Sequence, residues 1–264
     1  MTASGVPISA EGGSTPDREA YLADIVKSRR IQVFCAWCGP VFCVLLFGGW
    51  GLMAGFITPL ISPAHSAAQV AGAWSDHHTL KLLGLTIAMF GIALTLPFYL
   101  GISAQMRRTE LRLPLLSILQ LAAGIIITAV LLIPMLVFVV GAFRPERGGA
   151  LDQLINDASY IMLILPWPPI MVQVFSMAAA TFTDRRENPV FPRWFGYLNI
   201  WVGVLLVPAN MIIFFKTGPF AWTGVIGFWM PAAVFGLWYF VVTYVLLKAI
   251  KQEEAEDRAL FAPA

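Results

Sequence analysis

Three histidines and one carboxylate lie close together in segment 65–78. His65, His77 and His78 are the histidines of the chain, and Asp76 directly precedes the last two. Imidazole and carboxylate groups bind zinc or copper when several converge on one ion. Adjacent histidines point in different directions on a regular backbone, however, and one loop supplies only part of a ligand set. We therefore expect solvated loop residues and predict no cofactor. A metal-dependent membrane enzyme or oxidoreductase that uses these histidines is therefore the last of three functional hypotheses, and the other two are given below.

Three cysteines form a second group, in the stretch CAWCGPVFC. The C-x-x-C spacing of Cys35 and Cys38 is typical of redox motifs in soluble βαβ folds. The residues around it are continuously apolar instead. We expect Cys35, Cys38 and Cys43 to be buried and to pack as small hydrophobic side chains.

The remaining polar residues of the apolar runs are mostly uncharged. No Asp, Glu, Lys or Arg lies inside these runs, which contain Gln120, Gln173, Asn199 and Asn210. Ionisable groups at membrane depth mark proton relays and ion pathways, so their absence disfavours a proton-driven pump. It also removes the acid–base sets that a hydrolase would need. We expect these amides to form hydrogen bonds between helices. The exception is Asn210, two residues after Pro208, which is the strongest candidate for a ligand-binding role.

The stretch LILPWPPIMVQVF (163–175) combines an apolar sequence with three prolines. Proline has no backbone N–H and clashes with the carbonyl four residues earlier, so a helix interior excludes it. The first turn of a helix accepts it. We predict a helix break at Pro166, Pro168 and Pro169, with residues 161–167 irregular or in a short turn. A regular helix then starts at Pro168 or Pro169.

Prolines at a similar depth also interrupt the neighbouring runs, at Pro134, Pro208 and Pro231. Backbone groups freed at membrane depth need a side chain, ordered water or a cavity. We hypothesise an outward-facing pocket among spans 3–6 for a small apolar or weakly polar molecule. Its bounding residues would be Trp167, Gln173, Asn210 and Trp229. The alternative is four kinked helices that pack without a cavity.

The elements that hold these residues are predicted by composition. The chain of 264 residues is 58% hydrophobic and 12% charged, about half the charged fraction of a soluble domain. Six apolar runs are long enough to cross a bilayer as helices, the reasonable spanning form here. They cover about 33–58, 82–106, 114–143, 161–183, 194–215 and 224–247. The fold class is therefore an all-α, six-span membrane bundle.

The polar segments flank one transmembrane domain, 33–247. Segment 1–32 is expected to contain a short interfacial helix, and 248–264 is a charged tail. Of the 17 Lys and Arg residues, thirteen fall on the side of the N-terminus and four on the other. This bias predicts that both termini are cytoplasmic. The net charge of +2 does not indicate nucleic-acid binding.

Two of the expected inner loops have similar sequences, which suggests a faint internal repeat. RRTELRLP (107–114) and RRENPVFP (185–192) both have a proline six residues after a double arginine. Each precedes a span with an internal proline. The pattern suggests a parallel repeat of two hairpins, spans 2–3 and 4–5, as transporters often have. A chance match of two short stretches is the alternative.

The last third of the chain carries a resemblance. FPRWFGYLNIWVGVLLVP and FFKTGPFAWTGVIGFWMPAAVFGLWYFVV, within 187–242, resemble an uncharacterised family of bacterial six-span integral membrane proteins. The resemblance implies a bacterial inner (plasma) membrane and no activity. The leading hypothesis is a non-enzymatic protein that binds or transports a small hydrophobic molecule. The second is an accessory or scaffold subunit. Expected partners are the lipid bilayer and either another membrane protein or a second copy of the chain.

Overall fold

The computed structural model describes residues 15–57, 60–110, 113–144 and 147–259, with side chains omitted at 15–20 and 22. Regular secondary structure in these ranges is entirely helical. Six helical stretches are long and apolar enough to cross a membrane: Ala23–Met53, His78–Thr109, Leu115–Phe143, Gly149–Thr183, Arg193–Ile213 and Val225–Ala259. The predicted fold class is confirmed, and the chain is a multi-pass membrane protein.

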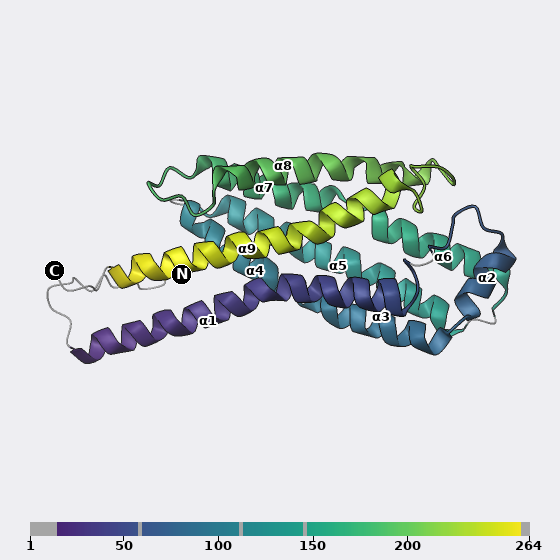
Figure 1. Ribbon diagram of the computed structural model, residues 1–264, viewed down its shortest axis with the longest axis horizontal. Coiled ribbons are helices and arrows are strands. Elements are labelled where there is room, and N and C mark those ends of the chain that lie inside the picture. The colour runs from purple at the N-terminus through teal and green to yellow at the C-terminus, as the bar shows by residue number, and fades with distance from the viewer. Residues whose placement is uncertain (1–14, 58–59, 111–112, 145–146, 260–264) are drawn as a thin grey trace.

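The first and last spans extend beyond the others. Helix α1 (Thr15–Leu45) continues into the π-helical segment η1 (Leu46–Met53), and α9 (Met230–Ala259) follows the π-helical segment η4 (Val225–Trp229). The predicted separate interfacial helix is wrong, because KSRRIQVF contains no residue that ends a helix. Helices α1 and α9 pack against each other and project together past the bundle (Figure 1). We call this the terminal end, and the opposite one the far end.

Span 2 is broken and span 3 is continuous. Span 2 consists of α3 (His78–Ala93), α4 (Thr95–Met106) and the single turn η2 (Arg107–Thr109). Span 3 is α5 (Leu115–Phe143). Glu110 caps α5, because its carboxylate accepts hydrogen bonds from the backbone N–H groups of Leu116 and Ser117 at 2.7 and 3.0 Å. These amides have no partner within the helix.

Span 4 consists of α6 (Gly149–Ile164) and α7 (Pro168–Thr183). The predicted break is present at 165–167, and a helix begins at Pro168. Residues 161–164, however, form the last turn of α6 rather than an irregular entrance. Helix α6 packs against α5 within the bundle. Its polar face, with Asp152 and Asn156, is buried, and its apolar face, with Leu154, is exposed.

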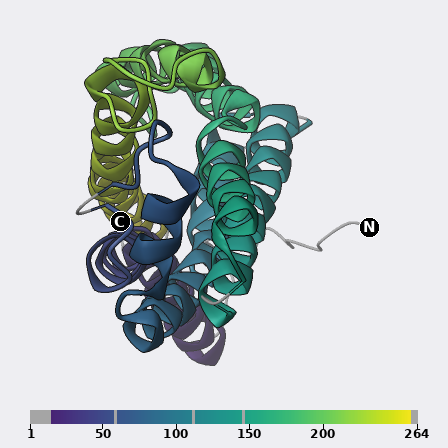
Figure 2. The same cartoon turned by 90° about the vertical axis from the view of Figure 1, so that its right-hand side faces the viewer.

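Span 5 consists of α8 (Arg193–Leu206) and the 3₁₀ segment η3 (Val207–Ile213). The remaining helix, α2 (Ala67–Ser75), lies at the far end, which faces the viewer in Figure 2. The segment before α2 folds over the bundle there. Tyr160 donates to the Phe56 carbonyl at 2.7 Å and Trp222 to the Ile61 carbonyl at 2.8 Å.

Candidate functional site

A partly enclosed cavity of about 50 Å³ lies among spans 1, 3, 4 and 6. We call it the central cavity. Its lining is Leu46, Phe47, Trp50, Leu131, Leu163, Ile164, Trp167, Gly227, Phe228, Pro231, Ala232 and Phe235. Because no lining residue is ionisable, the cavity suits an uncharged molecule.

Irregular helix segments form three of its walls. Trp50 comes from η1, Trp167 from the break between α6 and α7, and Phe228 from η4. π-Helical turns occur frequently at functional sites. The local sequence explains the wall from η1, because Gly49 lies so close to the backbone of Gly84 that a Cβ atom would clash with its carbonyl oxygen. The glycines around Trp50 thus let η1 pack tightly on α3.

Two tryptophans of this lining have buried hydrogen-bond donors. The indole nitrogens of Trp50 and Trp167 have no hydrogen-bond partner among the described residues. Trp50 as a whole is 2% exposed. A buried indole N–H usually has a partner, and an unsatisfied one costs about 1–3 kcal/mol. Two tryptophans of the cavity therefore have donors that an acceptor atom would satisfy.

The helix break adds backbone groups to the same wall. Pro166 and Pro168 have no N–H, so the carbonyls of Met162 and Ile164 lose the donor that a continuous helix supplies. Pro168 starts α7 at a position where the missing N–H does no harm. Ile164 lines the central cavity. The prolines thus free carbonyl groups on the helix that forms this wall.

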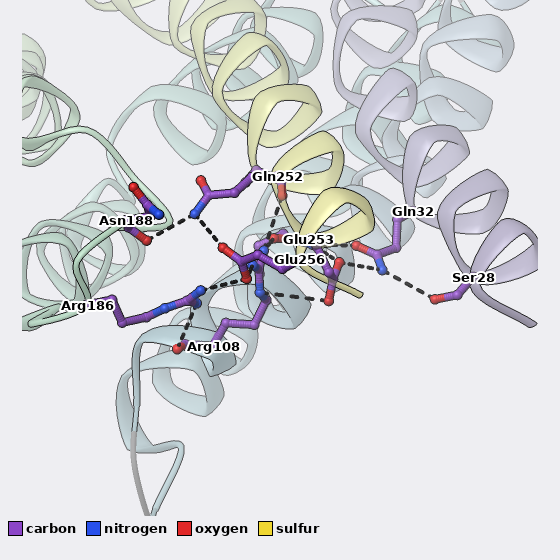
Figure 3. Close-up of polar contacts among 10 residues, drawn as sticks. Ser28, Gln32, Arg108, Arg186, Asn188, Gln252, Glu253 and Glu256 are labelled. Atoms are coloured by element: carbon purple, nitrogen blue, oxygen red, sulfur yellow. Dashed lines mark hydrogen bonds and ion pairs between the residues drawn. The ribbon is translucent and has the colours of Figure 1, made fainter. Parts of the chain in front are cut away.

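A cluster of polar side chains joins the helices at the terminal end (Figure 3). Glu256 of α9 accepts hydrogen bonds from Arg108 and Arg186, both at 2.8 Å. Arg108 belongs to η2, and Arg186 lies in the loop between α7 and α8. They are the second arginines of RRTELRLP and RRENPVFP. One carboxylate therefore connects the loops of the two predicted hairpins.

Further hydrogen bonds extend this cluster to α1. Glu253 accepts from Gln32 at 3.0 Å and from Gln105 at 2.7 Å. Gln252 donates to the Asn188 carbonyl at 3.0 Å and to Glu256 at 2.8 Å. We call the following set the terminal clasp: Gln32, Gln105, Arg108, Arg186, Gln252, Glu253 and Glu256. It ties α1, α4, η2 and the α7–α8 loop to α9.

No family model, curated protein or solved structure matches the chain.

The structure separates the four residues of the predicted pocket. Trp167 lines the central cavity, but Gln173 lines a second cavity of about 10 Å³, with Tyr99 and Tyr239. Asn210 donates to the Val207 carbonyl of its own turn at 3.0 Å, and Trp229 is exposed. The reason is that η3 turns Asn210 onto its own backbone.

Sequence reasoning missed the contribution of span 1. The predicted pocket lies among spans 3–6, whereas the central cavity is lined by spans 1, 3, 4 and 6. Trp50 of span 1 therefore lines the cavity, and no described residue of span 5 does. The stretch GGWG was the available signal, because small residues around a tryptophan indicate close helix packing. That signal alone did not distinguish packing from cavity lining.

The other candidate groups do not form a site in the described part of the chain. His65 is partly exposed, His77 has an exposed side chain 3.4 Å from Asp76, and His78 is exposed at the start of α3. No group of three or more His, Cys, Asp or Glu side chains that could hold a metal ion occurs among the described residues. The cysteines are buried and free, as predicted.

Proposed function

We propose that this membrane protein binds a small, uncharged, mostly apolar molecule in the central cavity. The observation that carries the proposal is the pair of buried indole N–H groups of Trp50 and Trp167 without acceptors. A molecule with a carbonyl or ether oxygen would satisfy them. An anion has no cation in the lining to pair with, and a cation has no carboxylate.

Access from the side of the bundle is part of this proposal. Hydrogen bonds from Tyr160 and Trp222 to the Phe56 and Ile61 carbonyls hold the segment before α2 against the far end. The terminal clasp joins the helices at the other end. The lining residues that keep partial exposure belong to spans 1, 4 and 6: Phe47, Leu163, Trp167 and Ala232. This exposure supports entry from the bilayer, where apolar molecules concentrate.

We propose a bacterial plasma membrane as the cellular setting, supported by the resemblance of residues 187–242 alone. We also propose that both termini are cytoplasmic, supported by the excess of Lys and Arg on the terminal side. The proposed activity is binding, without a chemical step. Transport of the bound molecule stays a prediction from the sequence.

The direct test uses two probes of the same shape. Acetone has an acceptor oxygen and is small enough for a cavity of about 50 Å³, and 2-methylpropene has a methylene group in place of that oxygen. Protein labelled with ¹⁵N-tryptophan is titrated in lipid nanodiscs with each probe, and Trp50→Phe and Trp167→Phe assign the two indole resonances. We expect acetone to shift both resonances and to bind about tenfold more tightly than 2-methylpropene, because one buried hydrogen bond contributes about 1.5 kcal/mol.

A matched pair of variants locates the binding. Ala232→Leu fills the cavity and should abolish both titrations. Ala233→Leu adds the same side chain at the neighbouring exposed position and should leave them unchanged. Equal binding of the two probes, or indole resonances that do not move, would refute the proposal.

A further inference from the structure

Seven basic residues at the terminal end form no ion pair with a described carboxylate. All seven are exposed. They are Lys27, Arg30, Arg107, Arg185, Arg193, Lys248 and Lys251. We call this set the basic rim.

Three of the four carboxylates of α9 form ion pairs or hydrogen bonds with other residues, and the fourth is the partly exposed Asp257. Glu254 pairs with Arg29 at 2.8 Å and with Arg258 at 2.7 Å, while Glu253 and Glu256 belong to the terminal clasp. They neutralise arginines on the faces where helices meet. Among the side chains described at this end, the exposed carboxylates are Asp24 and Glu187. The outer surface of the terminal end is therefore strongly positive.

Rim residues lie where exposed apolar stripes end. On α1, Arg30 is followed at helical spacing by the exposed side chains of Phe34 and Trp37. On α9, Lys248 lies over the ring of Tyr244, 4.6 Å from its centre, and Tyr244 is exposed. Aromatic residues next to cations are typical of the interface between lipid tails and headgroups.

The same arrangement recurs on α8. Arg193 begins this helix, and the exposed side chains of Trp194, Tyr197 and Trp201 follow it. Helix α9 packs against both α1 and α8, and the rim residues Arg107 and Arg185 lie outside these helices, in η2 and in the loop between α7 and α8. The cations are therefore distributed over several elements of the terminal end, near the level where the apolar surface stops.

We infer that the basic rim binds the headgroup phosphates of acidic phospholipids around the terminal end. A soluble acidic protein or a nucleic acid would need the cations gathered on one face. Arg30, Arg193 and Lys248 instead adjoin exposed apolar stripes on three helices, and the bilayer is the partner that covers such stripes. The inference is independent of any ligand in the central cavity.

Lipid retention tests this inference. The protein is reconstituted into bilayers of phosphatidylcholine with one part in four of phosphatidylglycerol, extracted in mild detergent, and analysed for bound lipid by mass spectrometry. We expect phosphatidylglycerol to be enriched two- to fourfold over the bulk bilayer. Extraction in 1 M NaCl should lower the enrichment, because salt screens exposed charges.

Two variants with the same charge change separate the rim from overall charge. Arg30→Gln with Lys251→Gln removes two rim cations and should reduce the enrichment by at least half. Arg144→Gln with Lys216→Gln removes two exposed cations elsewhere and should leave it unchanged. All four side chains are exposed, so both variants should fold. Absence of enrichment in the parent protein, or equal losses in the two variants, would overturn the inference.

Discussion

Replacing Glu256 by glutamine removes the charge that joins Arg108 to Arg186 while keeping the size of the side chain. Both arginines lie 2.8 Å from this carboxylate. The Arg108 side chain is 14% exposed, that of Arg186 31% and that of Glu256 39%. Charged hydrogen bonds contribute about 1.5–3 kcal/mol when buried, and exposed pairs about 0–1 kcal/mol. Because this site is half-exposed, we expect a loss of about 1.5 kcal/mol for the two bonds together.

Cysteine labelling measures this loss where it acts. Cys35 lies about one turn after Gln32 of the clasp, is 7% exposed and packs against Gly101 of α4. In a background with Cys38→Ala and Cys43→Ala, N-ethylmaleimide reacts with Cys35 when the terminal end opens. A loss of 1.5 kcal/mol raises the open population about tenfold. The labelling rate should rise by up to that factor if reclosing is faster than labelling.

Asp257→Asn is the matched control for this experiment. Asp257 follows Glu256 in α9 and forms no ion pair with a described residue. It loses the same charge, so its labelling rate should stay within twofold of the background protein. If Glu256→Gln labels no faster than Asp257→Asn, the terminal clasp does not hold these helices together and the reasoning fails.

Three further predictions concern stability, measured as the midpoint of thermal unfolding in detergent. Tyr160→Phe removes the hydrogen bond that holds the segment before α2 against the far end. The unpartnered carbonyl of Phe56 should cost about 1–2 kcal/mol and lower the midpoint. An unchanged midpoint would contradict this. Gly141→Ala places a Cβ atom against the ring of Trp74 and should cost about 1–3 kcal/mol, whereas Gly72→Ala, which meets open space in α2, should be neutral or stabilising by up to about 1 kcal/mol. Gln173→Met removes a buried amide nitrogen that has no described partner and should leave the midpoint equal or higher, so a clear drop would indicate a bound acceptor at that amide.

Spans and breaks were predictable because short-range rules determine them. Apolar length identified six spans, and the missing N–H of Pro168 identified the start of α7. The orientation of α6 was not predictable in the same way. Its periodicity is the same whichever face is buried, and the outcome depends on partners such as Trp74, which donates to Asn156 at 3.3 Å.

Long-range contacts explain why the candidate site was only partly predictable. Trp167 was identified from the prolines beside it. Trp50 was not assigned to the cavity, because its wall depends on the approach of Gly49 to Gly84 in another span. The double arginines and the acidic tail were both visible in the sequence. Nothing in their spacing indicates that Arg108 and Arg186 bind the same carboxylate.

Glu256 follows both of its arginine partners along the chain, and this sets the order in which the terminal clasp can assemble. Arg108 is synthesised 148 residues before Glu256, a delay of about 7–30 s at 5–20 residues per second. Until then neither loop arginine has this partner, and both retain the unpaired charge that orients loops during insertion. The same two side chains would therefore first direct membrane insertion and later, once Glu256 has been synthesised, join the helices of the terminal end.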